Sequence, residues 1–308
     1  MTTSDLSKLE NTVPSSGSRI VAFPNKASVG TVYAIQKSGL EDWLGEAKGR
    51  VNVPKDAYLR LAISLEASSD LSFLDALEPN AVGSIHLMCS HLDDEGLHHL
   101  EHLTGLEELV LSATEVTDEG LKTLLKLPSL ATLVLADTKI SDEGAAIIAE
   151  SQSLRKLNLA GTRITDRGLK ALSKLTDLTE LDLNSTKVSD AGITHLAALK
   201  NLKMLRVNGT RVSGVSLAKL HPAVKLTRIT LQDNDVSEKG LQAVSAFTTL
   251  EALCVANTRL KSKTLSLIAN LTNLEELCLS DTRIDDEGIA SISQIKGLRR
   301  LWLTRTKI

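Results

Sequence analysis

A short apolar motif returns every 24 residues along most of this chain, and that fixed period constrains the fold more than any other feature. Pairs of apolar residues spaced L-x-L start at Ile85/Leu87 and recur at each 24-residue step as far as Leu301/Leu303, without an insertion. One further pair, Leu61/Ile63, lies one period earlier in a less regular segment. A fixed period of roughly 20–50 residues indicates stacked structural repeats. We therefore predict one long solenoid, although a length of 308 residues would suggest two domains.

Each 24-residue unit predicts one strand followed by one short helix. The unit that begins at Leu106 reads L-x-x-L-x-L-x-x-T-x-V-T-D-x-G-L-x-x-L-x-x-L. Leu109 and Leu111 alternate with period two, so they point to one face of a strand. The leucines from Leu121 to Leu127 recur at spacings of three, which places them on one side of a helix. We expect an α/β solenoid, a curved horseshoe with a parallel sheet on its concave face and short helices on its convex face.

The composition supports leucine layers and narrows the functional classes. Of all residues, 42% are apolar but only 2% are aromatic, so leucine replaces the large rings that usually dominate cores. The net charge of −3 provides no general attraction to phosphate backbones or anionic lipid. The scarcity of aromatic rings also argues against a protein that stacks nucleic-acid bases. We therefore expect no nucleic-acid partner and no membrane association.

Other features of the sequence predict a cytoplasmic protein. No apolar run approaches the roughly 18 residues needed to span a bilayer. The first residues lack the basic-then-apolar order of a signal peptide. Three cysteines are an odd and low number, which suits reduced thiols better than a disulfide framework.

Two polar columns follow each strand, and both have a structural interpretation. A Thr follows the second strand leucine by three positions in eight units, and its hydroxyl is expected to bond backbone groups of a buried turn. An Asp-x-Gly triplet comes next, in which the Asp is expected to cap the helix N-terminus. The Gly indicates either a positive φ or a close backbone approach. Two units break the triplet, at Gly214/Ser216 and at Ser262/Thr264, so we expect their turns to differ.

These repeats resemble the leucine-rich-repeat family from Val82 to Ile308. The segments VTDEGL (116–121) and ITDRGL (164–169) are similar to the cysteine-containing subclass of F-box/leucine-rich-repeat ubiquitin-ligase adaptors and of multi-repeat bacterial proteins. This chain has Thr where that subclass has Cys or Asn. The resemblance implies a horseshoe that presents a binding surface. It does not carry the ligase role, because an F-box-like helical segment does not precede the repeats.

The residues before the repeats are interpreted as a tail and a cap. Residues 1–18 are rich in Ser and Thr and predict a flexible tail. Residues 19–81 hold short β-like runs and the degenerate first repeat, and we interpret them as a β-type N-terminal cap over the first leucine layer. The alternative is a small-ligand site within residues 19–63. The solenoid then spans residues 82–308, with ten units of which the last is truncated. The β-like runs are at residues 19–23, 28–35, 49–53 and 58–63.

The last unit ends after its strand and Thr306. Leu301 and Leu303 then lack an obvious cover, and unpaired strand edges recruit partners. We expect a second protein or a second copy of the chain to close this end, the latter as a homodimer through the uncapped C-terminal end.

Outward strand positions form the concave face, so binding residues should lie in columns spaced by 24. The middle of the face is mixed in charge, and a softer patch lies near its end. Trp302 is the most suggestive member, because exposed Trp is enriched at interface hot spots. The alternative is that Trp302 only shields the last layer. The predicted partner-binding residues are Lys156, Asp182, Arg206, Arg228, Cys254, Cys278, Arg300 and Trp302.

A second column, directly after the Thr, is mostly basic. It would suit an acidic partner. The alternative is a solvated structural face in which neighbouring Asp residues neutralise the cations at little gain in stability. The basic column comprises Lys139, Arg163, Lys187, Arg211, Arg259 and Arg283.

Neither a metal nor an enzyme is expected. Five of the seven histidines fall between residues 86 and 102, but His86 faces the concave side and His98 the convex helix, so they cannot share one site. A nucleophile beside a base and a glycine-rich phosphate loop are both lacking. We predict a non-enzymatic scaffold, without cofactor, that binds a protein or peptide through the concave face and the open C-terminal end. The alternatives are a sensor module with its ligand site in residues 19–63 and a homo-oligomeric structural protein.

Overall fold

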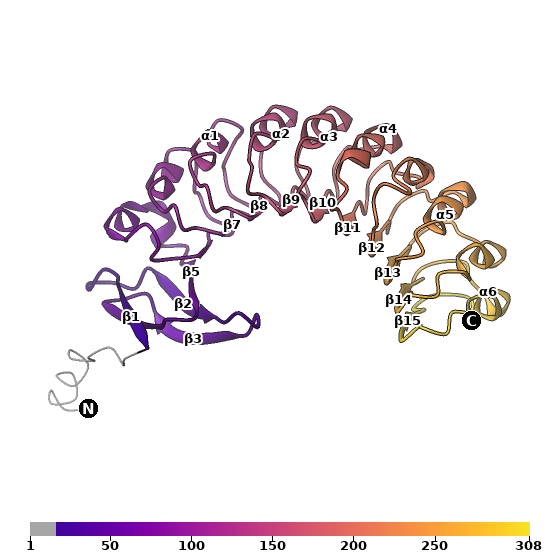
Figure 1. The fold of residues 1–308 in the computed structure, drawn as a ribbon, viewed down its shortest axis with the longest axis horizontal. Helices are drawn as coiled ribbons and strands as arrows, with labels where there is room; N and C mark the ends of the chain where they lie inside the picture. Colours follow the sequence, from indigo (N-terminus) through magenta and orange to yellow (C-terminus); the bar gives the residue numbers. More distant parts are fainter. Residues whose placement is uncertain (1–16) are drawn as a thin grey trace.

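The computed structural model describes residues 17–308, which form one open arc (Figure 1). The strands line the inner side of the arc and the helices its outer side, with one continuous apolar core between them. Residues 1–16 of the predicted tail lie outside the described residues. Ser18, which we assigned to the tail, is the first residue of the first strand.

Five strands precede the regular repeats. They are β1 (Ser18–Ala22), β2 (Gly30–Ile35), β3 (Glu41–Glu46), β4 (Arg50–Pro54) and β5 (Tyr58–Ile63). Strands β1 and β4 pair with each other, whereas β2 lies between β3 and β5, all antiparallel. Four of the five lie on the predicted β-like runs. Strand β3 was missed because its sequence, EDWLGE, is largely charged and mostly exposed.

Ten strands of three residues follow at intervals of 24. Each residue faces the residue 24 positions further on in the next strand, as Leu109 faces Leu133. Strand β5 joins this parallel array through Leu61, which faces Ile85, and β2 and β3 extend it to thirteen strands. The ten strands are β6 (Ser84–His86), β7 (Glu108–Val110), β8 (Thr132–Val134), β9 (Lys156–Asn158), β10 (Glu180–Asp182), β11 (Met204–Arg206), β12 (Arg228–Thr230), β13 (Ala252–Cys254), β14 (Glu276–Cys278) and β15 (Arg300–Trp302).

The outer side carries short α-helices and 3-10 helices. The α-helices are α1 (Leu121–Leu124), α2 (Asp142–Ile148), α3 (Asp166–Leu172), α4 (Asp190–Ile193), α5 (Glu238–Val244) and α6 (Asp286–Ile292). The 3-10 helices are η2 (Ala67–Ser69), η3 (Ser72–Ala76), η4 (Gly96–Leu100), η5 (Thr194–Ala198), η6 (Val215–Lys219) and η7 (Ser262–Ile268). The two units that lack both the Asp and the Gly of the triplet form 3-10 helices, as does the unit that keeps Asp94 and Gly96. The turn at Gly214 does differ, because its φ is +88° whereas the Asp at this position in other units has a negative φ.

The Asp of the triplet bonds the next unit and does not cap its own helix, so our capping assignment is wrong. Asp142 is already the first residue of α2, and the preceding Ser141 accepts the capping bond from the Glu143 N–H. The Asp142 carboxylate instead accepts from the Thr165 N–H (2.8 Å), the Thr165 hydroxyl (2.6 Å) and the Gly168 N–H (2.9 Å) of the following unit. The same link joins Asp94 to Thr117, Asp118 to Ser141, Asp166 to Ser189 and Asp190 to Ser213.

The same carboxylate explains the Gly of the triplet. A Cβ on Gly168 would lie 2.5 Å from Asp142 Oδ1, and one on Gly144 would collide with Asp118 Oδ1. Neither glycine has a positive φ. The sequence left open whether these glycines serve a positive φ or a close approach, and at these two positions the close approach of the Asp side chain is the reason.

The Thr column acts as predicted. The Thr162 hydroxyl donates to the Leu159 carbonyl at 2.6 Å, and each of the other seven Thr residues makes the corresponding bond. Asn234 uses its amide differently and reaches back to the preceding unit. Its Nδ2 donates to the carbonyls of Val207 (3.0 Å) and Val212 (2.9 Å). These bonds satisfy buried backbone groups that a tight turn would otherwise leave unpaired.

Candidate functional site

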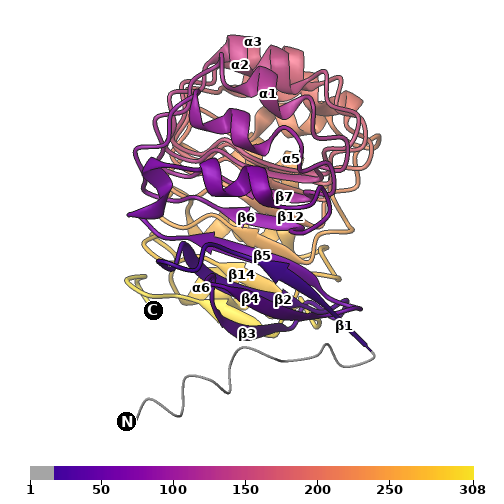
Figure 2. The ribbon, with the colours of Figure 1, turned by 90° about the vertical axis from the view of Figure 1, so that its left-hand side faces the viewer.

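The concave surface is built from outward residues of successive strands. Figure 2 views the arc from its N-terminal side, with β1–β5 in front. Because the period is 24, the residues between the two strand leucines lie in one row across the sheet. Neighbouring residues in a row are separated by one strand spacing, about 4.8 Å. A partner on this surface would meet a different side chain at each step.

Charges in the middle of the concave surface pair across neighbouring strands. Lys156 Nζ lies 2.7 Å from Glu180 Oε1, and Arg206 Nη1 lies 3.7 Å from Asp182 Oδ2. Asp182 is buried, and this burial raises the pKa of its carboxyl despite the nearby arginine. The predicted mixed-charge zone is therefore present, with its charges balanced internally.

Two arginines converge on one glutamate near the C-terminal part of the surface. Arg228 Nη1 lies 3.5 Å from Glu276 Oε2 across two strand steps, and Arg300 pairs with Oε1 of the same residue. Each guanidinium has five N–H donors, so most of them stay available. Trp302, in the same strand as Arg300, is 42% exposed.

A row of uncharged residues runs beside this ionic cluster. Thr230, Cys254, Cys278 and Trp302 are direct partners in successive strands from β12 to β15. Both cysteines are free and half-buried. The Thr230 Oγ1 atom is buried and has no hydrogen-bond partner within residues 17–308. The structure thus assembles the soft patch that the sequence predicted.

The basic column is only partly neutralised. Lys139 lies 3.6 Å from Glu115, and Arg259 lies 4.0 Å from Asp235, all four side chains being well exposed. The other four members have no side-chain partner in the part of the chain that the structure describes. The triplet aspartates do not neutralise them, because those carboxylates bond the next unit. The four unpaired members are Arg163, Lys187, Arg211 and Arg283.

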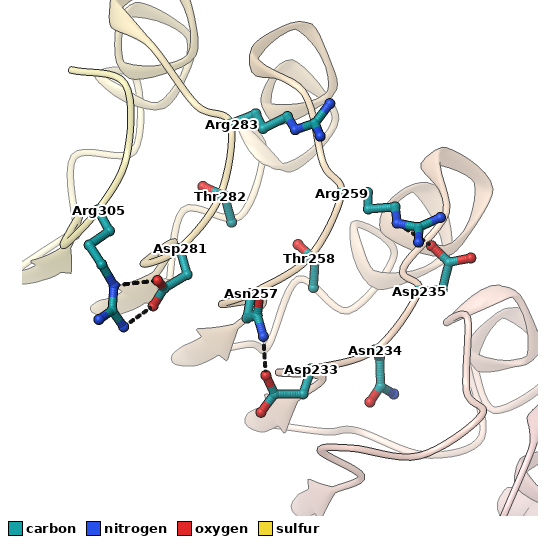
Figure 3. Close-up of a pocket in the computed structure, with 10 residues that line it drawn as sticks. All are labelled: Asp233, Asn234, Asp235, Asn257, Thr258, Arg259, Asp281, Thr282, Arg283 and Arg305. Carbon is teal, nitrogen blue, oxygen red and sulfur yellow. Dashed lines mark hydrogen bonds and ion pairs between the residues drawn. The ribbon is translucent and has the colours of Figure 1, made fainter.

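A hollow of about 570 Å³ lies at the ends of the strands from β12 to β15 (Figure 3). Arg305 donates to both oxygens of Asp281 at 2.5 and 2.9 Å, and Asn257 donates to Asp233 at 2.5 Å. These four residues share a left-handed backbone, with φ between +48° and +58°. We did not predict them as site residues. The recurrence of Asp, Asn, Gly or Ser at this position was the available signal, since these residues tolerate that conformation.

A second ionic cluster missed by the sequence analysis lies where β5 meets β6 and β7. One oxygen of Glu108 accepts from Ser84 Oγ (2.6 Å) and lies 3.1 Å from Arg60 and 3.4 Å from His86. Hydrogen bonds from His86 and Ser84, with the charge of Arg60, lower the pKa of Glu108 to about 2 against the opposing effect of burial. Arg60 also pairs with Glu41 of β3, so the cluster ties the N-terminal strands to the repeats.

Comparison with known proteins identifies the repeats. A model described as leucine-rich repeats (2 copies) matches residues 152–198, and a leucine-rich-repeat model matches residues 102–125, 126–149 and 270–293. The latter matches start a whole number of 24-residue periods apart. The chain is a leucine-rich-repeat protein.

Solved structures show the same fold as this leucine-rich-repeat protein. An internalin of Listeria monocytogenes, InlF, is similar with a TM-score of 0.58 and 24% identity, over 75% of this chain and 62% of that chain. A TLR13–ssRNA13 complex gives a TM-score of 0.53 and 22% identity, over 80% of this chain and 36% of that chain. The chain thus spans less than two thirds of either protein, and such identities show the fold alone. Among curated proteins, none matches by sequence.

The histidines of the leucine-rich-repeat protein bond acids and backbone. On the outer side His99 Nδ1 lies 2.9 Å from Asp75, and His98 Nδ1 lies 2.9 Å from Glu101. Within residues 17–308 no three His, Cys, Asp or Glu side chains gather as a metal site would require.

In the same residues, every helix is too short or too polar to cross a membrane. Membership of the cysteine-containing subclass and the lack of a nucleic-acid partner stay predictions.

Proposed function

We propose that this leucine-rich-repeat protein is a non-enzymatic scaffold that binds a protein or peptide along its concave surface. The observation that carries the proposal is the strip of solvent-accessible, chemically varied side chains on adjacent strands from β11 to β15. It joins an exposed tryptophan to arginines with donors to spare. Tryptophan and arginine are the residues most enriched in binding hot spots. The members of the strip are Arg206, Arg228, Cys254, Cys278, Arg300 and Trp302.

The unpaired part of the basic column supports a second contact zone. Arg163, Lys187 and Arg211 lie in three consecutive units, and their side chains are exposed. The exposed turn residues before them, Gly161 and Ser185, are small and uncharged. An acidic segment of the partner would find complementary charge there, which contributes to the association rate and to specificity. The free thiols favour a reducing, cytoplasmic setting.

A peptide-display selection tests the concave surface and does not require that the partner be identified first. Peptides are selected on the full chain and then measured against a Trp302→Ala/Arg206→Ala/Arg228→Ala variant. We expect the selected peptides to lose on the order of 100-fold in affinity, because a single hot-spot truncation costs about 2 kcal/mol or more and such losses are not additive. A further variant, Arg163→Glu/Lys187→Glu, should weaken acidic peptides selectively.

A matched variant on the outer side provides the control. It removes one exposed apolar residue and two cations, as Leu125→Ala/Arg167→Ala/Lys170→Ala. Peptide binding should persist in this variant. Equal loss in the concave and outer variants, with both folded, would reject the concave surface as the binding site.

The N-terminal region carries the alternative function. We propose that residues 19–81 form a cap, supported by the register of β5 on β6 and by the Arg60–Glu108 link. A hollow of about 430 Å³ beside Arg19 favours the sensor alternative, because small-ligand pockets have about this size. Deleting residues 1–63 separates the two. Loss of folding supports the cap, whereas a folded solenoid that loses a small ligand supports the sensor.

A further inference from the structure

Two thiols stand side by side on the concave surface. Cys254 in β13 and Cys278 in β14 are direct partners in a parallel pair, so their side chains project from the same face one strand spacing apart. Trp302 is the next residue in the row on one side and Thr230 on the other.

We propose that Cys254 and Cys278 form a two-thiolate site for a soft monovalent cation of the Cu(I) class. Binding replaces the two thiol protons, which pass to solvent, by two metal–sulfur bonds, so that no oxidant or reductant is required. Soft thiolate ligands select Cu(I) among the first-row metals. The site goes beyond the binding of a protein or peptide and does not depend on it.

The strand spacing fits a bridging cation better than a disulfide. Neighbouring strands are about 4.8 Å apart, and side chains at paired positions run nearly parallel. Two metal–sulfur bonds of about 2.3 Å, the length known for zinc, span about 4.6 Å in a line. A disulfide needs a Cβ–Cβ separation of about 3.8 Å, so the two nearly parallel side chains would have to tilt toward each other.

The surroundings of the thiols favour the same assignment. The hydrogen-bond partners of both thiols are neutral: Cys254 Sγ lies 4.0 Å from Gln232 Oε1, and Cys278 Sγ lies 3.8 Å from Ser280 Oγ. The buried Thr230 hydroxyl, which lacks a hydrogen-bond partner among the described residues, offers an oxygen beside Cys254. Trp302 lies beside Cys278, where an aromatic face attracts a cation.

The number of ligands distinguishes Cu(I) from zinc. Zn²⁺ in structural sites takes four ligands, usually Cys and His. Within residues 17–308 the two thiols have no third Cys, His, Asp or Glu that would complete such a set. A cation that is satisfied by two thiolates therefore suits the pair, and Zn²⁺ should bind weakly.

Competition with a coloured Cu(I) chelator such as bicinchoninate tests the site on the full chain under anaerobic, reducing conditions. We expect the wild type to take one Cu(I) per chain. Cys254→Ser and Cys278→Ser should each weaken binding by on the order of 100-fold, because a single thiolate then remains. Cys89→Ser is the matched control and should bind as the wild type does, since Cys89 is exposed and belongs to another part of the arc.

Silver(I), a redox-stable probe, gives a second readout through Trp302. In a Trp43→Phe background, which leaves Trp302 as the single tryptophan, one equivalent of Ag⁺ should quench the fluorescence. In the wild type, Ag⁺ should protect two of the three thiols from alkylation by N-ethylmaleimide. The protection experiment needs no substitution, so it decides the matter even if the serine variants do not fold.

Several results would overturn the proposal. Cu(I) binding that survives in the Cys254→Ser/Cys278→Ser double variant would place the ion elsewhere. Zn²⁺ binding as tight as Cu(I) binding would reject the two-coordinate site. Rapid loss of two thiols and of two mass units on exposure to oxidised glutathione, without unfolding, would show a disulfide pair in its place.

Discussion

The carboxylate of Asp142 is the most direct test of how the units are held together. It accepts three hydrogen bonds from Thr165 and Gly168, all in the next unit. Asp286 begins α6 in the same Asp-Glu-Gly context, but its side chain makes no such bond among the described residues. Asp142→Ala therefore removes the link between units, whereas Asp286→Ala removes only the local effect of an acid at a helix start.

The three hydrogen bonds set the expected magnitude. Hydrogen bonds to a charged group contribute about 1.5–3 kcal/mol each, but bonds to a single carboxylate are not additive and Asp142 is partly exposed. We therefore expect Asp142→Ala to lower the free energy of unfolding by about 2–4 kcal/mol. Asp286→Ala should cost about 0.3–1 kcal/mol, the usual effect of the helix dipole. Asp142→Asn retains one acceptor oxygen and should fall between them.

Urea unfolding followed by circular dichroism gives the global comparison. Native-state hydrogen exchange adds the local one, because repeat proteins open unit by unit. The Thr165 and Gly168 amides should exchange faster in Asp142→Ala than in the wild type, whereas their exchange rates should not change in Asp286→Ala. If the two variants lose the same stability, or if the two amides keep their protection, the carboxylate does not link the units and the reasoning fails.

Three other predictions concern single contacts. The ionised Glu108, whose pKa is about 2 in the fold against an ordinary 4.5, stabilises the protein above pH 4.5 and loses this effect as the pH falls toward 2. The free energy of unfolding should therefore fall less between pH 4.5 and 2 in Glu108→Gln than in the wild type. We expect the difference to be about 1–2 kcal/mol after allowance for solvent screening, as measured by chemical denaturation at each pH. Gly144→Ala should lower the free energy of unfolding by about 1–3 kcal/mol, because the new Cβ would collide with the Asp118 carboxylate. The loss should be smaller when Asp118 is also replaced by Ala. A double-mutant cycle that shows no coupling between the two positions would contradict this collision. Asn234→Thr restores the column residue yet should cost about 1–3 kcal/mol in urea unfolding, because the Val212 carbonyl loses its donor; an unchanged or raised stability would refute this.

The period made most of the fold predictable from sequence. It located all ten repeat strands, and the Thr column followed because its partner lies three residues away, as for Thr162 and Leu159. The same local view failed for Asp142, whose partners lie 23 and 26 residues further on. Strand β3 also escaped, since its pairing with β2 outweighs a charged sequence. Propensity describes only the local preference of a segment.

The candidate surface was predictable to a similar extent. The period alone put Cys278 next to Cys254 and Trp302. It did not reveal that Arg228 would reach over two strands to Glu276, because such a pairing depends on side-chain length and rotamer. Nor did the period show which members of the basic column remain unpaired, because this depends on which groups the neighbouring carboxylates bond.

The run of Asp links ends at Asp190, so the later units lack this connection between neighbours. In the next three units the position holds Gly214, Glu238 and Ser262, and of these only Ser262 accepts a backbone bond from the following unit, at 3.0 Å. We therefore expect the arc to be stiffer through its first half than through its second. Bending should then concentrate in the second half, so that the concave surface around Trp302 can adjust to a partner while the N-terminal part keeps its shape.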